Sequence, residues 1–401
     1  MVGICPLSNP VREYAWGSRS AIAKLLGQPA PSPRPQAEIW MGAHPNDPSR
    51  ARCRGEWISL PDLLRENPAD ILGAPVAARF DGELPFLFKV LAAVQPLSVQ
   101  AHPDREQARE GFERESAAGI ALGARERNYP DPHPKPELIC ALSPFSALCG
   151  FRPLPEIARA FRDLQIDAFA SEVESLECDG DPKTLEQLFA AVWNASNDRL
   201  ARAIDQAVTH AERRSGDPAA RWMTAIAALY PGDAGVLAPL FLNLVALAPG
   251  EAMYLGAGKL HSYLEGVGVE IMGNSDNVLR GGLTAKHVDI PELCRVLRYE
   301  PGEAEILVPR EISPGERVFE TPADEFELAV LSIEQGKPWR SARSRGVEIL
   351  LAIEGKVTIT DRGVGESFVL ERGASVLVPD SVDCYELAGT GVVYRAGTPN
   401  A

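Results

Sequence analysis

A block of helical periodicity, residues 154–246, interrupts a chain whose other segments alternate short apolar runs with turns. Its apolar residues recur at the three- and four-residue spacing of one helix face, as at Leu185, Leu188, Phe189, Val192 and Trp193. The segments 219–230 and 236–247 are predicted to be helical as well. Because this block is all helical, the rest of the core has to be built from another kind of element.

The remaining segments predict a mainly β structure. Residues 84–93 indicate a buried strand that contains Lys89, and short helices are predicted for 18–27 and from Ser59 onward. After residue 249, Pro-Gly and Gly turns separate short β-rich runs such as 348–353, 357–360 and 375–378. Many short strands between turn residues are typical of a sandwich or a barrel.

An internal repeat supports this interpretation. Residues 247–268 align with 370–391 at five identical positions of 22, and His261 then falls opposite Cys384. We interpret the two segments as parts of two related β-barrel halves, of which only one carries a histidine. Chance similarity between turn residues is the alternative explanation.

Charge and cysteine content exclude several classes of function. The formal net charge of -15 argues against general nucleic-acid binding, which needs a basic face. No apolar run reaches the roughly 18 residues that span a bilayer, and the first residues lack the pattern of a signal peptide. The seven cysteines are scattered and form no CxxC pair, which favours free thiols in a reducing cytoplasm. We therefore expect a cytoplasmic protein that binds neither membrane nor nucleic acid.

Three short segments carry candidate metal ligands. In an extended strand, Ser98, Gln100 and His102 project to one face, although a solvent-facing polar strand would look the same. The prolines around Lys135 and Glu137 favour extended backbone that places both on one face, as in an ordinary surface ion pair. His261 follows a glycine-rich turn, where a lone histidine is more often a core residue than a ligand.

Together the three segments supply a ligand set for zinc. Gln100, His102, Glu137 and His261 offer two imidazoles, one carboxylate and one amide oxygen. This mixture of nitrogen and oxygen suits a catalytic Zn²⁺ with room for substrate or water. Two histidines and a carboxylate can also form the facial triad of an Fe(II) oxygenase, which is the first alternative.

A fourth segment, residues 269–286, combines charged and apolar residues. Arg280 and Lys286 could hold a phosphate or stabilise a developing enediolate. The composition of this segment alone favours a solvated loop with an ordinary arginine.

In this order, the segments resemble the type I mannose-6-phosphate isomerases. The resemblance covers about residues 9–289 and, more loosely, the C-terminal region. It rests on Tyr14-Ala15-Trp16-Gly17-Ser18, Ala37-Glu38-Ile39-Trp40-Met41-Gly42, Leu84-Pro85-Phe86-Leu87-Phe88-Lys89, Gln100-Ala101-His102-Pro103-Asp104, Lys135-Pro136-Glu137, Asn274-Ser275-Asp276-Asn277 and Arg280-Gly281-Gly282-Leu283-Thr284. The ordered set is what makes the resemblance specific.

The resemblance implies a fold and a division of the chain. The expected fold is mainly β with an α-helical insertion: two cupin (jelly-roll) barrels plus a helical domain. The expected parts are 1–153 of the catalytic barrel, the helical domain 154–246, the return to the catalytic barrel 247–300, and a C-terminal barrel without a metal site, 301–401.

It also implies roles for individual residues. The family's ligands to a single zinc ion correspond to Gln100, His102, Glu137 and His261, and its catalytic arginine to Arg280. Ser98, Lys135 and Lys286 correspond to polar residues around the sugar phosphate. Other pocket positions correspond to Trp16, Glu38, Lys89, Tyr263, Glu270 and Asp276. The sequence departs from the family at His133-Pro134-Lys135, where Asn-His-Lys is common, which affects the expected shape of the ligand loop.

The implied reaction interconverts mannose 6-phosphate and fructose 6-phosphate through an enediol, with Zn²⁺ as a Lewis acid. The general base is left open among Lys286, Glu270 and Asp276. The alternatives are the cupin oxygenase and a non-catalytic sugar-binding cupin. The expected partner is a small sugar phosphate, and in the absence of a zipper or a long apolar edge we expect a monomer.

Overall fold

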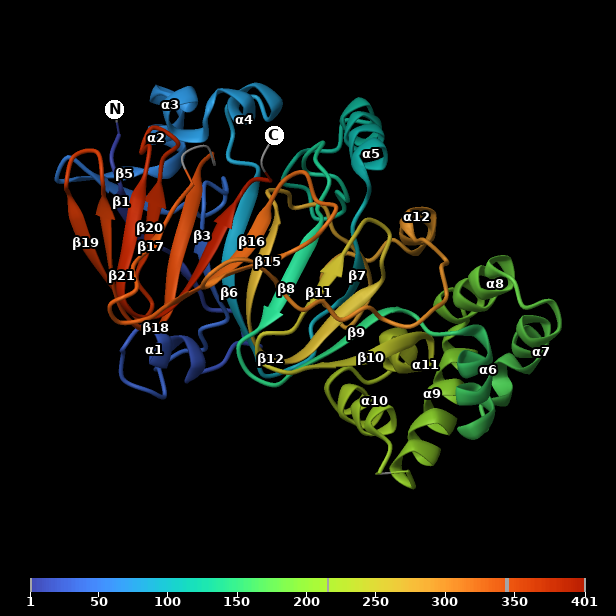
Figure 1. Ribbon diagram of the computed structural model, residues 1–401. Helices are drawn as coiled ribbons and strands as arrows, with labels where there is room; N and C mark the ends of the chain where they lie inside the picture. Colours follow the sequence, from blue (N-terminus) through green and yellow to red (C-terminus); the bar gives the residue numbers. More distant parts are fainter. Residues whose placement is uncertain (1, 215, 343–345, 400–401) are drawn as a thin grey trace.

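The structure is a computed structural model that describes residues 2–214, 216–342 and 346–399. It is mostly β-sheet with one helical region, as the sequence predicts (Figure 1). The strands occupy the left and centre of Figure 1, and helices α6 to α11 lie together on the right, beside β9 and β10. Among the described residues, no helix combines the length and the apolar character that crossing a bilayer requires.

Two antiparallel sheets are formed by the described residues. The first contains ten strands: β2 (Val11–Arg12), β3 (Glu38–Met41), β6 (Phe86–Ala93), β7 (Val99–Ala101), β8 (Glu137–Ala141), β9 (Phe145–Phe151), β10 (Leu242–Leu247), β11 (Ala252–Leu255), β12 (His261–Gly273) and β13 (Leu279–Gly282). The second contains eleven: β1 (Cys5–Ser8), β4 (Arg50–Cys53), β5 (Glu56–Ser59), β14 (Arg310–Ser313), β15 (Glu316–Phe319), β16 (Glu327–Ile333), β17 (Trp339–Arg340), β18 (Glu348–Asp361), β19 (Ser367–Glu371), β20 (Ser375–Val378) and β21 (Tyr385–Gly397).

Helices connect the sheets and form the insertion. They are α1 (Ala21–Leu25), α2 (Leu60–Glu66), α3 (Pro68–Leu72), α4 (Ala74–Arg79), α5 (Arg105–Ala117), α6 (Leu154–Asp163), α7 (Ala170–Asp179), α8 (Pro182–Trp193), α9 (Asn197–Glu212), α10 (Pro218–Leu229), α11 (Ala238–Phe241) and α12 (Ile290–Val296), with short 3-10 turns at Asp167–Phe169 and Ala234–Leu237. Ser59 precedes α2 as expected, whereas α1 begins after Ser20 rather than Ser18.

The helical region follows the predicted spacing except at its end. The apolar face of α8 is buried in the largest apolar cluster, and the Asp181 side chain caps the first turn by accepting from the Thr184 amide. The predicted helix over 236–247 is wrong for residues 242–247, which form strand β10 instead. Local composition does not distinguish a buried strand from a buried helix, and the antiparallel pairing of β10 with β9 decides the outcome.

Strand β6 separates two environments. Every residue of this strand is buried, as predicted. On one face, Phe86, Phe88 and Val90 pack into the apolar core shared with the second sheet. Because neighbouring side chains of a strand point to opposite faces, Lys89 lies on the other face, with Leu87 and Leu91. The lysine therefore points away from the core between the sheets.

Strand β12 changes its facing residues through a bulge. Its first half pairs with β7 and β9, its second half with β6 and β8, and the register shifts between Tyr263 and Glu265. Tyr263 and Glu270 are seven positions apart, an odd number that would put their side chains on opposite faces of a regular strand. The bulge lets the two side chains meet. Gly266 makes this possible, because its φ is 138° and a Cβ there would lie 2.5 Å from Phe145.

The internal repeat coincides with matching strands. The alignment of 247–268 with 370–391 has an offset of 123 residues, which places β11 directly on β20. In both segments a 4-residue strand is followed by a 13-residue strand, β12 or β21. Cys384 precedes β21 by one residue and is partly buried.

The expectation of free thiols is wrong for one pair. Cys5 and Cys53 form a disulfide between the neighbouring strands β1 and β4. The pairing escaped detection because 48 residues separate the two positions and nothing in their spacing marks them. Cys140, Cys149, Cys178, Cys294 and Cys384 are free, as expected.

We expect Cys53→Ser to lower the free energy of unfolding by about 2–4 kcal/mol, because the disulfide closes a long loop and restricts the unfolded chain. Denaturant unfolding should show this difference without reductant and lose most of it with dithiothreitol. Cys178→Ser, at an exposed free cysteine, is the matched control. Equal unfolding free energies for wild type and Cys53→Ser without reductant would contradict a stabilising bond.

Candidate metal centre

Three of the predicted ligands converge on one point. The side chains of His102, Glu137 and His261 are buried, and one ligand atom from each lies within 4.8 Å of the others. The Nε2 atom of His102 lies 3.3 Å from Oε1 of Glu137, and Nε2 of His261 lies 3.4 Å from Oε2. These are the only three histidine, cysteine or acidic residues grouped in this way within the described ranges.

Neighbouring strands bring these residues together. Gln100 on β7 pairs directly with His261 at the start of β12, and their Nε2 atoms are 3.4 Å apart. Glu137 begins β8, which pairs with both β11 and β12. The hydroxyl of Ser98 donates to Oε1 of Gln100 at 2.9 Å, so these two side chains lie on one face, as predicted.

Backbone carbonyls fix the tautomers of both histidines. Nδ1 of His102 lies 2.7 Å from the carbonyl oxygen of Asn277, and Nδ1 of His261 lies 2.9 Å from that of Lys259. A carbonyl only accepts, so each Nδ1 carries the proton and each Nε2 keeps its lone pair. Both lone pairs face Glu137.

This arrangement fits a divalent cation. Nε2 of His102 and Oε2 of Glu137 are buried and have no hydrogen-bond partner among the residues that the structure describes. Buried polar atoms are rarely left unpaired, and imidazoles held by a carbonyl at Nδ1 are the usual form of histidine ligands. A metal ion would complete the coordination of these atoms.

The charges also favour a metal. Burial lowers the pKa of His102 to about 4, against the opposing effect of Glu137, so the imidazole is neutral near pH 7. Burial would raise the pKa of Glu137, but the Lys135 ammonium and His102 hold it well below its usual value. Lys135 contacts Glu137 at 3.0 Å, so the expected ion pair exists, although it is buried rather than on the surface.

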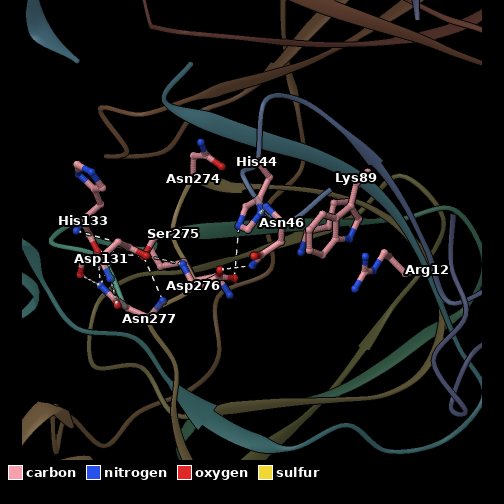
Figure 2. A network of polar contacts seen from close by, with 12 residues as sticks. Arg12, His44, Asn46, Lys89, Asp131, His133, Asn274, Ser275, Asp276 and Asn277 are labelled. Carbon is pink, nitrogen blue, oxygen red and sulfur yellow. Dashed lines mark hydrogen bonds and ion pairs between the residues drawn. The ribbon is translucent and has the colours of Figure 1, made fainter. Parts of the chain in front are cut away.

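A network of hydrogen bonds joins residues 274–277 to the loop that precedes β8 (Figure 2). Asn277 is fully buried, and its amide donates to the carbonyls of Asp131 and His133, each at 2.8 Å. The Asp131 carboxylate accepts from the Ser275 hydroxyl and from the Asp276 amide, both at 2.8 Å. The carbonyl that orients His102 is thus fixed by the loop that leads into Glu137.

We expect Asn277→Ala to weaken zinc binding by about 10- to 100-fold, the usual effect of removing a group that orients a metal ligand. The substitution leaves two buried carbonyls without their donor and frees the loop that fixes His102. Competition with a chelating dye would measure the affinity. Asn194→Ala, whose amide donates to a helical carbonyl of α8, is the control; equal zinc affinity for both variants would contradict this role.

Lys89 forms buried ion pairs with two glutamates beside the candidate metal centre. Nζ of Lys89 lies 2.8 Å from Glu270 and 3.9 Å from Glu38. Tyr263 donates to the second oxygen of Glu270 at 2.8 Å. Burial would lower the pKa of Lys89, but the carboxylates around it, led by Glu270, raise it above its usual value. Lys89 is therefore a fixed cation, which is why the buried strand tolerates it.

Two further cations remain without a partner. Within the part of the chain that the structure describes, the side chains of Arg280 and Lys286 form no ion pair or hydrogen bond. Burial lowers the pKa of Arg280. Lys286 keeps much of its surface exposed, yet partial burial and the charge of Arg280 lower the pKa of its ammonium. Both residues interact electrostatically with Asp276.

The structure therefore brings together most of the predicted site residues. Trp16 is half-buried and packs against the apolar cluster that contains Tyr263. Residues to which the sequence assigned no role are His44, Asn46, Asp131 and Asn277, all in the network of Figure 2. Only Asn277 had a signal, because it lies in the polar run 274–277 after a buried strand.

Comparison with known proteins places this geometry in a family. The family model "Phosphomannose isomerase type I, catalytic domain" matches residues 4–154, and "Phosphomannose isomerase type I, helical insertion domain" matches residues 161–242. The chain belongs to the type I phosphomannose isomerases. The family expected from the sequence, and with it an enzyme of mannose-6-phosphate isomerisation, is confirmed.

Relatives of this phosphomannose isomerase span nearly its full length. It is 42% identical to mannose-6-phosphate isomerase of Escherichia coli (strain K12), over 97% of this chain and 98% of that protein. It is 32% identical to the Homo sapiens protein of the same name, over 94% and 93%. The crystal structure of mannose 6-phosphate isomerase from Salmonella typhimurium bound to fructose 6-phosphate and zinc has a TM-score of 0.91 and 38% identity, and the match covers 99% of both chains.

Proposed function

We propose that the centre formed by His102, Glu137 and His261 binds one zinc ion, and that mannose 6-phosphate and fructose 6-phosphate are interconverted there. The observation that carries this proposal is two buried atoms that have no hydrogen-bond partner among the described residues, Nε2 of His102 and Oε2 of Glu137. The first faces Oε1 of Glu137 and the second faces Nε2 of His261. The Salmonella typhimurium relative that binds zinc and fructose 6-phosphate supports it.

Gln100 completes the ligand set. Its amide nitrogen faces His261 at 3.4 Å, while its oxygen accepts from Ser98. Rotating the amide by half a turn brings the oxygen toward His261 and turns the nitrogen to Ser98, whose hydroxyl can accept as well as donate. When bound, zinc supplies Lewis acidity toward the oxygens of the sugar.

Arg280 holds the negative charge of the substrate, and Lys286 lies near enough to interact with the charge of Arg280. The Arg280 guanidinium has no ion-pair partner among the described residues and is partly withdrawn from water, and such a group binds an anion strongly. Arg280 stabilises the negative charge of the enediolate as it develops. Ser98 and Lys135, which contact the ligands Gln100 and Glu137, complete the polar side of the sugar site.

Lys286 is the best candidate for proton transfer between C1 and C2. A general base has to be unprotonated near the working pH, and the pKa of Lys286 is lowered toward that range. Glu270 is unsuitable, because Lys89 and Tyr263 occupy one oxygen each. Asp276 has a lowered pKa, which makes it a weak base and suits it to accept hydrogen bonds from sugar hydroxyls.

The other residues expected around the substrate form one side of the proposed substrate site. Lys89, Glu270 and Tyr263 form one bonded unit, and Trp40 donates to Glu38 at 2.8 Å. Because these groups satisfy one another, they present a fixed surface to the substrate, with Trp16 beside it. An Fe(II) oxygenase is not favoured, since the relatives are isomerases.

The proposal also includes the division of the chain into two cupin barrels and a helical domain. Two cupin barrels, with the divisions 1–153, 154–246, 247–300 and 301–401, agree with the coincidence of β11–β12 and β20–β21 in the repeat. The C-terminal barrel lacks a histidine at the position of His261, where Cys384 stands. A monomer in the cytoplasm remains the expected state, and size-exclusion chromatography with light scattering would test the monomer.

A coupled assay tests the function directly. The purified protein with mannose 6-phosphate should form fructose 6-phosphate, and metal analysis should find about one zinc per chain. Oxygen consumption with bound iron and without ketose would identify an oxygenase. Binding of the sugar phosphate without turnover would identify a sugar-binding protein.

A further inference from the structure

A buried histidine outside the metal centre contacts the pocket carboxylate Asp276. His44 lies in the loop between β3 and β4, and its side chain is 2% exposed. Its Nε2 atom lies 3.3 Å from Oδ1 of Asp276, and the Asn46 amide donates to Oδ2 at 2.7 Å. Figure 2 shows both side chains directed at the carboxylate. Both carboxylate oxygens are therefore held from one loop.

The tautomer of His44 is fixed by its own loop. The backbone N–H of Asn46 donates to Nδ1 of His44 at 3.3 Å. Nδ1 is therefore the acceptor, and Nε2 carries the proton that is donated to Asp276. The ring of Trp40 packs edge-on against the imidazole at 4.9 Å and limits its rotation. This tautomer is the opposite of that of His102 and His261, whose Nε2 atoms are free for a metal.

Both ends of the contact are rigid. The loop that carries His44 is closed by the Ser49 amide, which donates to the Gly42 carbonyl, and by Arg12, which pairs with Asp47 at 2.6 Å. On the other side, the backbone amide of Asp276 donates to Asp131 at 2.8 Å. The Asp276 side chain itself is 41% exposed, so its carboxylate remains accessible to a molecule from solvent.

We propose that His44 and Asn46 are positioning residues, which keep the Asp276 carboxylate ionised and aimed at the hydroxyl groups of the sugar. This inference rests on the proposed function of the pocket. Two donors at fixed distances select one rotamer of a side chain that would otherwise turn toward the surrounding cations. Preorganising such an acceptor before substrate arrives lowers the barrier without a change in the metal centre.

The charges around Asp276 set the expected pH dependence. The titratable and charged groups that face it are His44, Lys89, Lys135, Arg280, Lys286 and Asp131. Burial would raise the pKa of Asp276, but His44 reverses this and lowers it, with smaller contributions from the lysines. Without His44 the pKa rises, so the acid side of the pH–rate profile should move to higher pH.

The test compares two replacements of His44. Glutamine can place an N–H near the position of Nε2, whereas asparagine is too short. We expect His44→Asn to lower kcat/KM by about 10- to 100-fold and to shift the acid limb to higher pH, because the carboxylate is misplaced and less readily ionised. His44→Gln should recover most of both effects. Zinc content and affinity should stay at the wild-type level in both variants, and His210→Asn in α9 is the control.

Asp276→Asn separates this inference from the proposed function. If Asp276 acts as proposed, Asp276→Asn loses at least as much activity as His44→Asn, and the double variant loses little more. Full activity in Asp276→Asn would overturn the role of the carboxylate itself. A large loss in Asp276→Asn with wild-type rate and pH profile in His44→Asn would overturn the positioning role alone. If His44→Asn lowered the melting temperature and left the pH–rate profile unchanged, the contact would only stabilise the packing of the two loops. That result would likewise overturn the positioning role.

Discussion

Chelation of the metal is expected to abolish isomerase turnover, with a loss of about 1,000-fold or more, because several kcal/mol of charge stabilisation is removed and about 1.4 kcal/mol corresponds to a factor of ten. Zinc added back should restore the rate. The chain's own groups cannot replace the metal, because the Nε2 lone pairs of both imidazoles face the Glu137 carboxylate at 3.3 and 3.4 Å, and Lys135 neutralises only that carboxylate.

Two measurements make this prediction specific. The melting temperature should fall on chelation and rise again in proportion to added zinc, because a ligand that binds only the folded state stabilises it. His102→Ala should bind zinc weakly and should not be rescued by added metal at ordinary concentrations. His210→Ala, in the helical region, should behave as wild type. A chelated, metal-free preparation that keeps its full rate would refute the zinc centre.

The sequence indicated which acidic and imidazole residues would converge, but it did not predict all connections of the fold. Gln100 and His102 lie on β7 and at its end, Glu137 begins β8, and His261 begins β12, so the four residues come from three separate strands. Their residue types, in combination, indicated one metal ion, and the structure brings the three acidic and imidazole ligands within 4.8 Å. The ability to bind a metal depends on the residue types, so it can be recognised in a sequence before the fold is known.

Non-local contacts explain what escaped prediction. The sequence predicts a helix for residues 242–247 because a buried apolar run has no periodicity of its own. Their partner strand, β9, lies almost a hundred residues away in the chain, so local composition does not reveal the pairing. The disulfide between Cys5 and Cys53 depends on the register of β1 with β4, which no spacing rule gives. Both features are decided by tertiary neighbours.

The role of His44 could not be predicted from the sequence for a related reason. Beside Pro45 in a loop, it resembles any surface histidine, yet it is almost completely buried. Its partner Asp276 is more than 230 residues away in the chain, and only the packing of the two loops reveals the contact. Asp131 and Asn277 are similar cases, because their function is to hold backbone groups that the sequence does not display.

Arg280→Met is expected to lower kcat by about 100- to 1,000-fold, the effect of removing one group that stabilises a developing oxyanion. The backbone of Arg280 pairs with Gln100 between β13 and β7, so its guanidinium is carried on the same sheet as the metal ligands. Because this side chain has no partner among the described residues, its removal leaves no buried group unsatisfied. The melting temperature and the zinc content should therefore stay close to the wild-type values.

The conservative variant distinguishes charge from geometry. Arg280→Lys keeps the charge but loses the planar, forked donor, so it should recover only part of the lost rate. Arg65→Met, at an exposed position in α2, is the matched control and should leave both kcat and KM unchanged. If Arg280→Met instead raised KM and left kcat intact, the guanidinium would bind the substrate and the transition state equally, and the role in enediolate stabilisation would be wrong. The kcat and KM values of these three variants therefore decide whether Arg280 interacts with the negative charge of the enediolate or with that of the bound substrate.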